Sequence, residues 1–373
     1  MKVKLAFFAV LVIFLVLAID SSLTAVDTRD IDQVLKKTVL DPRDFEIIDR
    51  FLDEAVQELV RERNFTEIHK RRAVIISRKS EQGQYAEHFS KSAYKHIQEG
   101  FAQANDLTPE KRKTNAIVNL LILIHGLEDL RMVNLAANWL DNGNAVIRYW
   151  AVKCLTSPAI VQQLNAGANS NPAQAAAIVG RLNSLVEAGS AEILIQMARF
   201  AAGLNIPQAE PLLLKVADER IKRYAAWKVR HELSDIVLLK LLEAKISVAA
   251  PGSSASVSKP AVARRFAQLY SYVMQRYLKG PVVLNETQKN HLASVMVEVQ
   301  EKCVSRLLGA PQTTIRRALE RESMAAISDE HNALLGSGST SGQLPAKLGF
   351  DYGTDPAGAK RTAPIPLPDA PRK

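Results

Sequence analysis

The stretch NAVIRYWAVKCL, Asn144–Leu155, decides the fold. Apolar residues recur in it at positions 147, 150, 151, 154 and 155, which is the spacing of one face of an α-helix. This face predicts that Trp150 packs in a core. Arg148 lies beside the face near the helix start, where the helix dipole disfavours a cation. We therefore expect Arg148 to pair with Asp141 or with an aspartate of a neighbouring unit, and a ligand-binding arginine is the alternative.

A second stretch repeats the pattern. In both stretches an apolar helical segment ends in an aspartate, and an arginine followed by a tyrosine comes next. The residues concerned are Asp141, Arg148 and Tyr149 in the first stretch and Asp218, Arg223 and Tyr224 in the second. The distance between the two stretches corresponds to about two paired-helix repeats.

This unit resembles the HEAT/armadillo family of α-helical repeats. The matching residues are Asp141, Ile147, Arg148 and Ala151 in the first copy, and Asp218, Arg223 and Ala226 in the second. Lys222 stands where the family has an apolar residue. The resemblance covers about residues 110–245. It implies an all-α solenoid of helical hairpins, in which Arg–Asp pairs join stacked repeats.

The composition also favours helices, because only 6% of the residues are aromatic and the alanine and leucine content is high. No strand pattern is evident. We expect five regions after the N-terminal segment: an N-terminal helical region over 26–107, the repeat region over 108–248, a flexible linker over 249–259, a C-terminal helical region over 260–335 and a disordered tail over 336–373. The linker and the tail are rich in Gly, Ser and Pro and poor in large apolar residues.

The N-terminal segment predicts export. Two lysines precede the uncharged run Leu5–Ile19, and polar residues follow it. This is the order of a secretory signal peptide, with cleavage expected after Ala25. The run is shorter than the roughly 20 residues of a membrane-spanning helix. We expect a periplasmic or secreted protein, and an uncleaved N-terminal membrane anchor is the alternative.

Catalytic and metal-binding motifs are missing from the sequence. The histidines do not occur at metal-ligand spacing, and no nucleophile motif is present. His88 and His96 share one face of a predicted helix, where they form either part of a site or isolated surface residues. Cys154 and Cys303 are predicted to be small core residues, and one disulfide between them is the alternative. No catalytic, cofactor-binding or metal-binding residue is therefore predicted.

The net charge of +9 gives a second line of inference. Five basic residues gather in one segment and are candidates for anion binding: Lys70, Arg71, Arg72, Arg78 and Lys79. A solvated basic surface is the simpler interpretation. We expect a non-enzymatic scaffold in the cell envelope that binds another protein. A binder of an anionic polymer or membrane surface is the alternative, and a helical glycan-cleaving enzyme is the third. Nucleic acid and small-molecule ligands are not expected.

Overall fold

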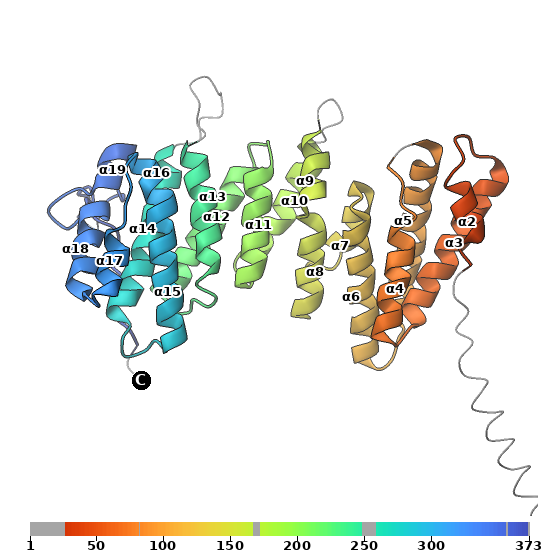
Figure 1. Ribbon diagram of the computed structural model, residues 1–373, viewed down its shortest axis with the longest axis horizontal. Helices are drawn as coiled ribbons and strands as arrows, with labels where there is room; N and C mark the ends of the chain where they lie inside the picture. The colour runs from red at the N-terminus through yellow and green to blue at the C-terminus, as the bar shows by residue number, and fades with distance from the viewer. Residues whose placement is uncertain (1–26, 82, 167–171, 248–258, 356, 372–373) are drawn as a thin grey trace, which may run out of the picture. The chain divides into compact units, whose positions relative to one another are not determined.

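The computed structural model describes residues 27–81, 83–166, 172–247, 259–355 and 357–371. Throughout these residues the chain forms helices joined by loops, with no β-sheet, so the predicted all-α fold is confirmed (Figure 1). The chain divides into two compact units, Met1–Leu135 and Ala136–Lys373. The predicted signal segment and all of the predicted linker except Lys259 lie outside the described residues.

The first unit is built around one long helix. Its elements are α2 (Arg29–Val34), α3 (Pro42–Arg61), α4 (Phe65–Ile76), α5 (Gly83–Asn105), α6 (Glu110–Leu127) and η1 (Leu130–Met132), and α7 (Val133–Ala137) follows. The Asp41 side chain accepts hydrogen bonds from the first turn of α3, and the Asp44 side chain accepts one from the backbone of Asp41. This capping box fixes where α3 begins. The apolar face of α3 packs against α2, α4, α5 and α6.

The second unit holds the remaining helices. They are α8 (Ala145–Leu155), α9 (Pro158–Asn165), α10 (Pro172–Leu185), α11 (Ala191–Gly203), α12 (Ala209–Ala225), α13 (Ser234–Ser247), α14 (Lys259–Lys279), α15 (Glu286–Val299), the π-helical turn η3 (Gln300–Val304), α16 (Ser305–Leu308), α17 (Thr314–Glu320), α18 (Met324–Leu335) and α19 (Gln343–Leu348).

The central element of the second unit is α14. It contacts α12, α13, α15, α18 and α19. Its side chains Phe266, Tyr270 and Val273 are fully buried, and the Tyr270 hydroxyl donates a hydrogen bond to the carbonyl of Met296 on α15. Because α14 is packed against several helices, the neighbouring helices restrict the positions of its polar side chains. These residues form the candidate site described below.

The second copy of the repeat pattern does not form the predicted turn. Asp218 lies inside α12, which runs without a break from Ala209 to Ala225. Arg223 is therefore in the last turn of that helix and not at the start of a new one. The prediction was wrong because Asp is only a weak helix breaker, and the apolar face of Leu212, Leu213 and Val216 continues through the position to Tyr224.

The predicted disordered tail is ordered over its described residues. Leu344 is fully buried, and Phe350 and Tyr352 pack edge to face. A Cβ atom on Gly336 would overlap the carbonyl oxygen of Thr362, and Gly336 itself has φ +107°. The glycines of the 336–342 stretch thus allow two backbone segments to cross closely. The glycine-rich composition, which predicted disorder, therefore accompanies tight packing in this stretch.

Both cysteines are buried, and Cys154 and Cys303 do not form a disulfide with each other. Among the described residues, no helix has both the length and the apolar character that a membrane crossing requires.

Candidate functional site

The first predicted site residues serve a local structural role. Arg148 donates to the carbonyl oxygens of Asn142 at 2.6 Å and Gly143 at 3.0 Å, and so closes the turn before α8 instead of pairing with Asp141. Trp150 is only partly buried, and the ammonium of Lys153 lies 4.4 Å from its ring centroid. Tyr149 packs edge to face against Trp150. The prediction that Trp150 is a core residue was wrong, because the buried face is formed by Ile147, Ala151 and Leu155 and Trp150 lies at its edge.

The second set of predicted residues is dispersed. Arg223 donates to the carboxylate of Glu219 at 2.7 Å and to the carbonyl of Glu187 at 3.0 Å. Asp218 pairs with Arg265 of α14 at 2.8 Å. Arg223 therefore has no aspartate partner in the described part of the chain, whereas Asp218 joins α12 to α14 through an arginine outside the repeat pattern. Tyr224 is fully buried and belongs to a different network.

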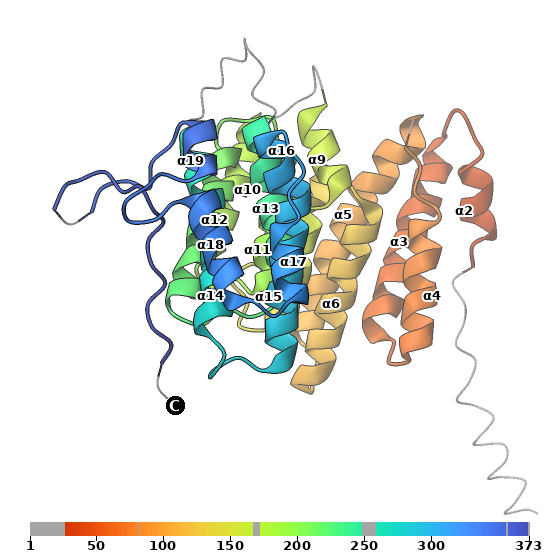
Figure 2. The same ribbon diagram turned by 60° about the vertical axis from the view of Figure 1, so that its left-hand side comes forward.

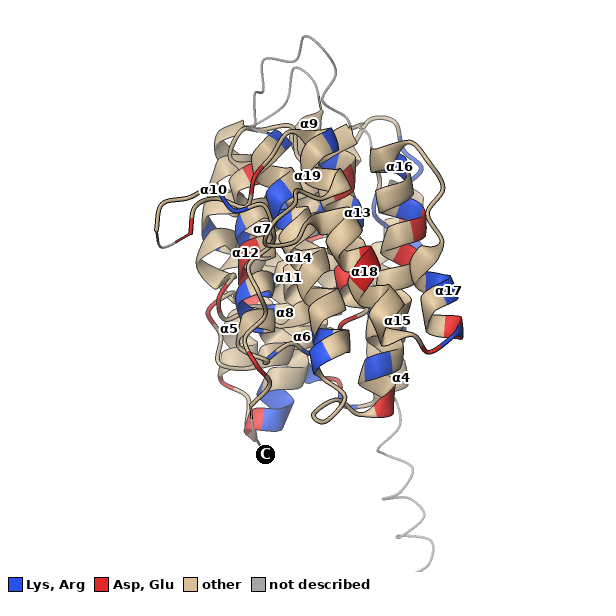
Figure 3. Ribbon diagram, turned by 90° about the vertical axis from the view of Figure 1, so that its left-hand side faces the viewer, with Lys and Arg blue, Asp and Glu red and all other residues tan. Residues whose placement is uncertain are grey.

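The basic segment of α4 does not present one cationic face. The Arg71 guanidinium pairs with the carboxylates of Glu58 and Glu62, and Arg72 donates to Asn119. Arg78 pairs with Asp32, and Lys70 pairs with Glu67 on the surface. Lys79 is half-buried. In the second unit too, basic and acidic residues alternate over the face that Figure 3 shows.

The second unit contains a buried ionic network that the sequence did not reveal. Arg220 on α12 is 1% exposed and donates through Nε and Nη2 to Asp235 of α13, both at 2.7 Å. The Tyr224 hydroxyl donates to the same carboxylate at 2.7 Å. Burial acts to lower the pKa of Arg220, but the charge of Asp235 outweighs it and raises that pKa. Burial raises the pKa of Tyr224 well above its usual value. Both groups therefore keep their protons, and the network holds α12 to α13.

A second buried arginine lies beside this network. Arg276 on α14 is 3% exposed, and its guanidinium carbon lies 5.2 Å from the Trp227 ring centroid and 5.8 Å from that of Tyr224. Its nearest acid is the buried Glu232, at 3.9 Å from Nη2, which is too long for a hydrogen bond. Among the described residues, Nε and Nη1 of Arg276 have no acceptor, and Oε1 of Glu232 has no donor.

Residues 364–369 lie extended against α14 (Figure 2). Gln268 and Gln275, two helical turns apart, bind its backbone. The Gln268 amide accepts from the backbone N–H of Ile365 at 2.8 Å and donates to its carbonyl at 3.1 Å. Gln275 accepts from the N–H of Leu367 at 2.7 Å. We call this surface of α14, with Lys279 and Trp227, the α14 groove.

The α14 groove satisfies the backbone of the bound segment with few contacts. In Pro364–Pro368 the three prolines have no N–H, so Ile365 and Leu367 carry the available donors, and both are bound. Lys279 donates to the Leu367 carbonyl at 2.6 Å, and Trp227 Nε1 donates to that of Pro368 at 3.0 Å. The Leu367 side chain is 1% exposed, whereas Ile365 is 44% exposed. The groove thus binds an extended Pro-x-Pro-Leu-Pro segment through its backbone and one side chain.

A pocket of about 770 Å³ adjoins the end of the α14 groove. Trp227 belongs to both, and Pro371 lines the pocket. Trp227 has φ +57°, a conformation that non-glycine residues adopt rarely, and it begins the loop from α12 to α13. The lining residues are Trp227, Lys228, Val229, Arg230, Arg276, Val283, Leu284, Gln288 and Pro371. None of these described residues is acidic, whereas three are cationic.

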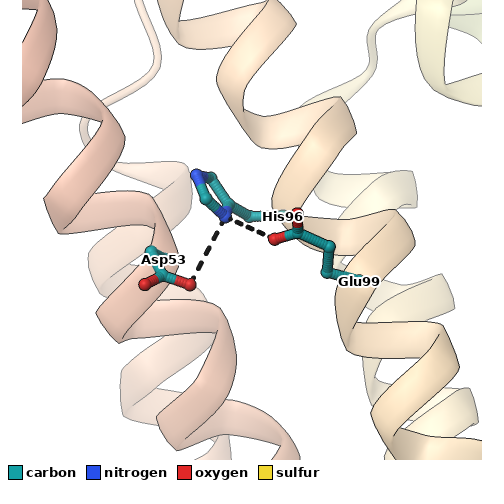
Figure 4. Close-up of side chains that lie close together, drawn as sticks. All are labelled: Asp53, His96 and Glu99. Atoms are coloured by element: carbon teal, nitrogen blue, oxygen red, sulfur yellow. Dashed lines mark hydrogen bonds and ion pairs between the residues drawn. The ribbon is translucent and has the colours of Figure 1, made fainter.

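The first unit has a separate cluster that joins α3 to α5 (Figure 4). His96 Nδ1 lies 2.9 Å from the Glu99 carboxylate and 3.4 Å from that of Asp53. These ligand types and distances could surround a metal ion. However, Nε2 of the buried His96 has no acceptor among the described residues, whereas metal-bound histidines usually donate that nitrogen to a second partner. We interpret the cluster as a polar contact between the helices, like the contact of His88 with Asp49.

A scan against models of known protein families, a search of curated proteins and a search of solved structures each found no match to this chain. The site is therefore defined by its own geometry. The sequence carried one signal for it, the pair of glutamines at i and i+7 on a single predicted helix. Helical surfaces often carry such polar residues, so the pair by itself did not indicate a binding groove.

Proposed function

We propose that this chain is a non-enzymatic interaction protein that binds an extended, proline-rich segment of another protein in the α14 groove. The observation that carries the proposal is the binding of the chain's own Pro364–Pro368 by Gln268, Gln275 and Lys279. These contacts recognise backbone groups, which any chain of the same shape provides. The end of the chain thus acts as an intramolecular stand-in for the partner.

Physical chemistry supports a partner rich in proline. An extended segment with alternating prolines is already close to its bound conformation, so it loses little entropy on binding. Prolines also remove N–H groups that the groove leaves without an acceptor. The partner therefore needs a leucine or similar side chain at the position of Leu367, which is buried, and tolerates change at the position of Ile365, which faces solvent.

The bound tail competes with any partner for the α14 groove. A tethered segment competes at an effective concentration that reaches roughly millimolar for short flexible linkers. A partner must therefore bind more tightly than the tail or be present at a high local concentration.

The proposal includes a scaffold role and the stacking of helical repeats. It also includes location in the cell envelope, which rests on the N-terminal segment alone.

The test uses a chain that ends at Thr362, which keeps the contact of Thr362 with Ser337 and exposes the groove. A labelled peptide with the sequence of Ala363–Pro371 should bind with a saturable change in fluorescence anisotropy. A peptide with serine at the position of Ile365 should bind about equally well, whereas one with aspartate at the position of Leu367 should not bind. Replacing both Gln268 and Gln275 by alanine should abolish binding in a chain that is still helical by circular dichroism. Equal binding of all three peptides would refute the proposal.

A further inference from the structure

The guanidinium of Arg276 is a buried cation with incomplete hydrogen bonding. It is 3% exposed and lines the 770 Å³ pocket, yet its Nε and Nη1 have no acceptor among the described residues. A buried polar group without a hydrogen-bond partner costs about 1–3 kcal/mol, and a charged one costs more. A ligand with an acceptor at this guanidinium would offset part of that cost.

The network beside Arg276 does not supply the missing acceptors. Asp235 is already engaged by Arg220 and Tyr224. Glu232 lies 3.9 Å away, and its second oxygen lies 3.8 Å from Nδ1 of His291. The Val229 carbonyl accepts from Nη2 at 3.5 Å, the upper limit for a hydrogen bond. Arg276 thus has one weak acceptor and one counter-charge, Glu232, that lies within ion-pair distance but forms no hydrogen bond with it.

The rest of the pocket has the charge that an anion requires. Lys228 and Arg230 are exposed residues of its lining, and Gln288 offers an amide. Trp227 forms one wall over the Arg276 guanidinium, at 5.2 Å. An oxyanion beside this wall would form charge-assisted hydrogen bonds with the guanidinium, which are stronger than those between neutral groups.

We propose that this pocket binds an oxyanion, a carboxylate or phosphate group, with Arg276 as the principal contact and Arg230 and Lys228 at the entrance. The group comes either from a free anion in solution or from an acidic side chain of a segment that lies in the α14 groove. The inference does not rest on the proposed function. Apart from Pro371, the pocket is lined by α14, the first turn of α15 and the loops before α13 and α15, which are present whether or not a partner occupies the groove.

Trp227 provides the readout. The chain has three tryptophans, so replacing Trp139 and Trp150 by phenylalanine leaves Trp227 as the sole emitter in the full chain. Sodium phosphate is titrated at constant ionic strength, which is held with sodium chloride, and acetate is titrated in parallel. The expected result is a saturable change in emission with at least one of the two anions and no saturation with chloride alone.

Three variants locate the binding. Arg276→Lys keeps the charge but loses the planar donors, and we expect at least about a tenfold loss of affinity. Arg230→Gln is an exposed change that does not disturb the core, and we expect a loss of several-fold. Lys222→Gln is the matched control, because Lys222 is an exposed lysine of α12 outside the pocket, with 70% of its side chain accessible. Its affinity should equal that of the parent chain.

Pro371 distinguishes the two sources of the anion, since it lines the pocket. If an attached carboxylate fills the site, Pro371→Glu should weaken phosphate binding while Pro371→Gln should not. If only a free anion fits, both variants should bind phosphate equally well. A linear response to both anions, or equal affinity in Arg230→Gln, Arg276→Lys and the parent chain, would overturn the proposal. Peptide binding in the α14 groove is measured separately, so either proposal can fail alone.

Discussion

Replacing Asp235 by alanine should destabilise the second unit strongly. Asp235 is fully buried and accepts three hydrogen bonds, two from Arg220 and one from Tyr224, all at 2.7 Å. Without the carboxylate, the Arg220 guanidinium remains in the core with only a 3.3 Å contact to the carbonyl of Arg230. Arg220 cannot avoid the cost of a buried, unpaired charge by losing its proton, because an arginine stays charged in proteins.

The size of the effect follows from what is left behind. Removing one partner of a buried ion pair costs about 3–5 kcal/mol, because the remaining charge is uncompensated. For a unit of this size, each kcal/mol lowers the melting temperature by about 2–4 °C. The expected decrease is therefore about 6–20 °C. The same reasoning predicts a smaller cost when Arg220 and Asp235 are both replaced by apolar residues of similar volume.

The assay is thermal unfolding followed by tryptophan fluorescence. Trp139, Trp150 and Trp227 are all in the second unit, so the signal reports that unit alone. Asp218→Ala is the matched control, since Asp218 also pairs with an arginine but has 51% of its side chain exposed. An exposed pair contributes at most about 1 kcal/mol. If the two variants lost the same stability, the argument from burial would be refuted.

Three further predictions follow from other contacts. Trp150→Ala should cost less than the roughly 3–5 kcal/mol of a fully buried aromatic, because Trp150 is partly exposed; a cost in that range in urea unfolding would place it in the core. Burial raises the pKa of the Cys303 thiol to about 12. We therefore expect no reaction of Cys303 with a thiol reagent at pH 8 in the folded chain and full reaction in urea, and rapid labelling of the folded chain would contradict its burial. Deleting everything after Gly336 should lower the melting temperature by more than a few degrees, because it removes the buried Leu344 and Leu367; an unchanged value would show that the tail does not pack.

Local patterns in the sequence were sufficient to predict the helical fold. The 3.6-residue spacing of apolar side chains identified α8, and its buried face includes Ile147, Ala151 and Leu155 as expected. The same pattern could not decide whether α12 is one helix or two. The answer depends on whether the apolar face continues beyond Asp218. The repeat pattern places the end of a helix at its aspartate and gives no information on the residues that follow.

The candidate site could not be predicted because it joins distant segments. Arg220 meets Asp235 across a loop, and Gln268 meets Ile365 from far along the chain. Composition misled the prediction for the tail, because glycine and proline occur both in disordered chains and where backbones pack closely. Gly336 belongs to the second case, since any side chain there would overlap the backbone at Thr362.

We propose that the α14 groove is a peptide-binding site that the chain's own tail occupies. The most direct test compares one peptide, with the sequence of Ala363–Pro371, in binding to the chain that ends at Thr362 and to the full chain. Isothermal titration calorimetry should give one site on the shortened chain. On the full chain the affinity should be at least about tenfold weaker, because the tethered tail competes at a high effective concentration. Equal affinity for both chains, or no binding to a folded shortened chain, would contradict the claim.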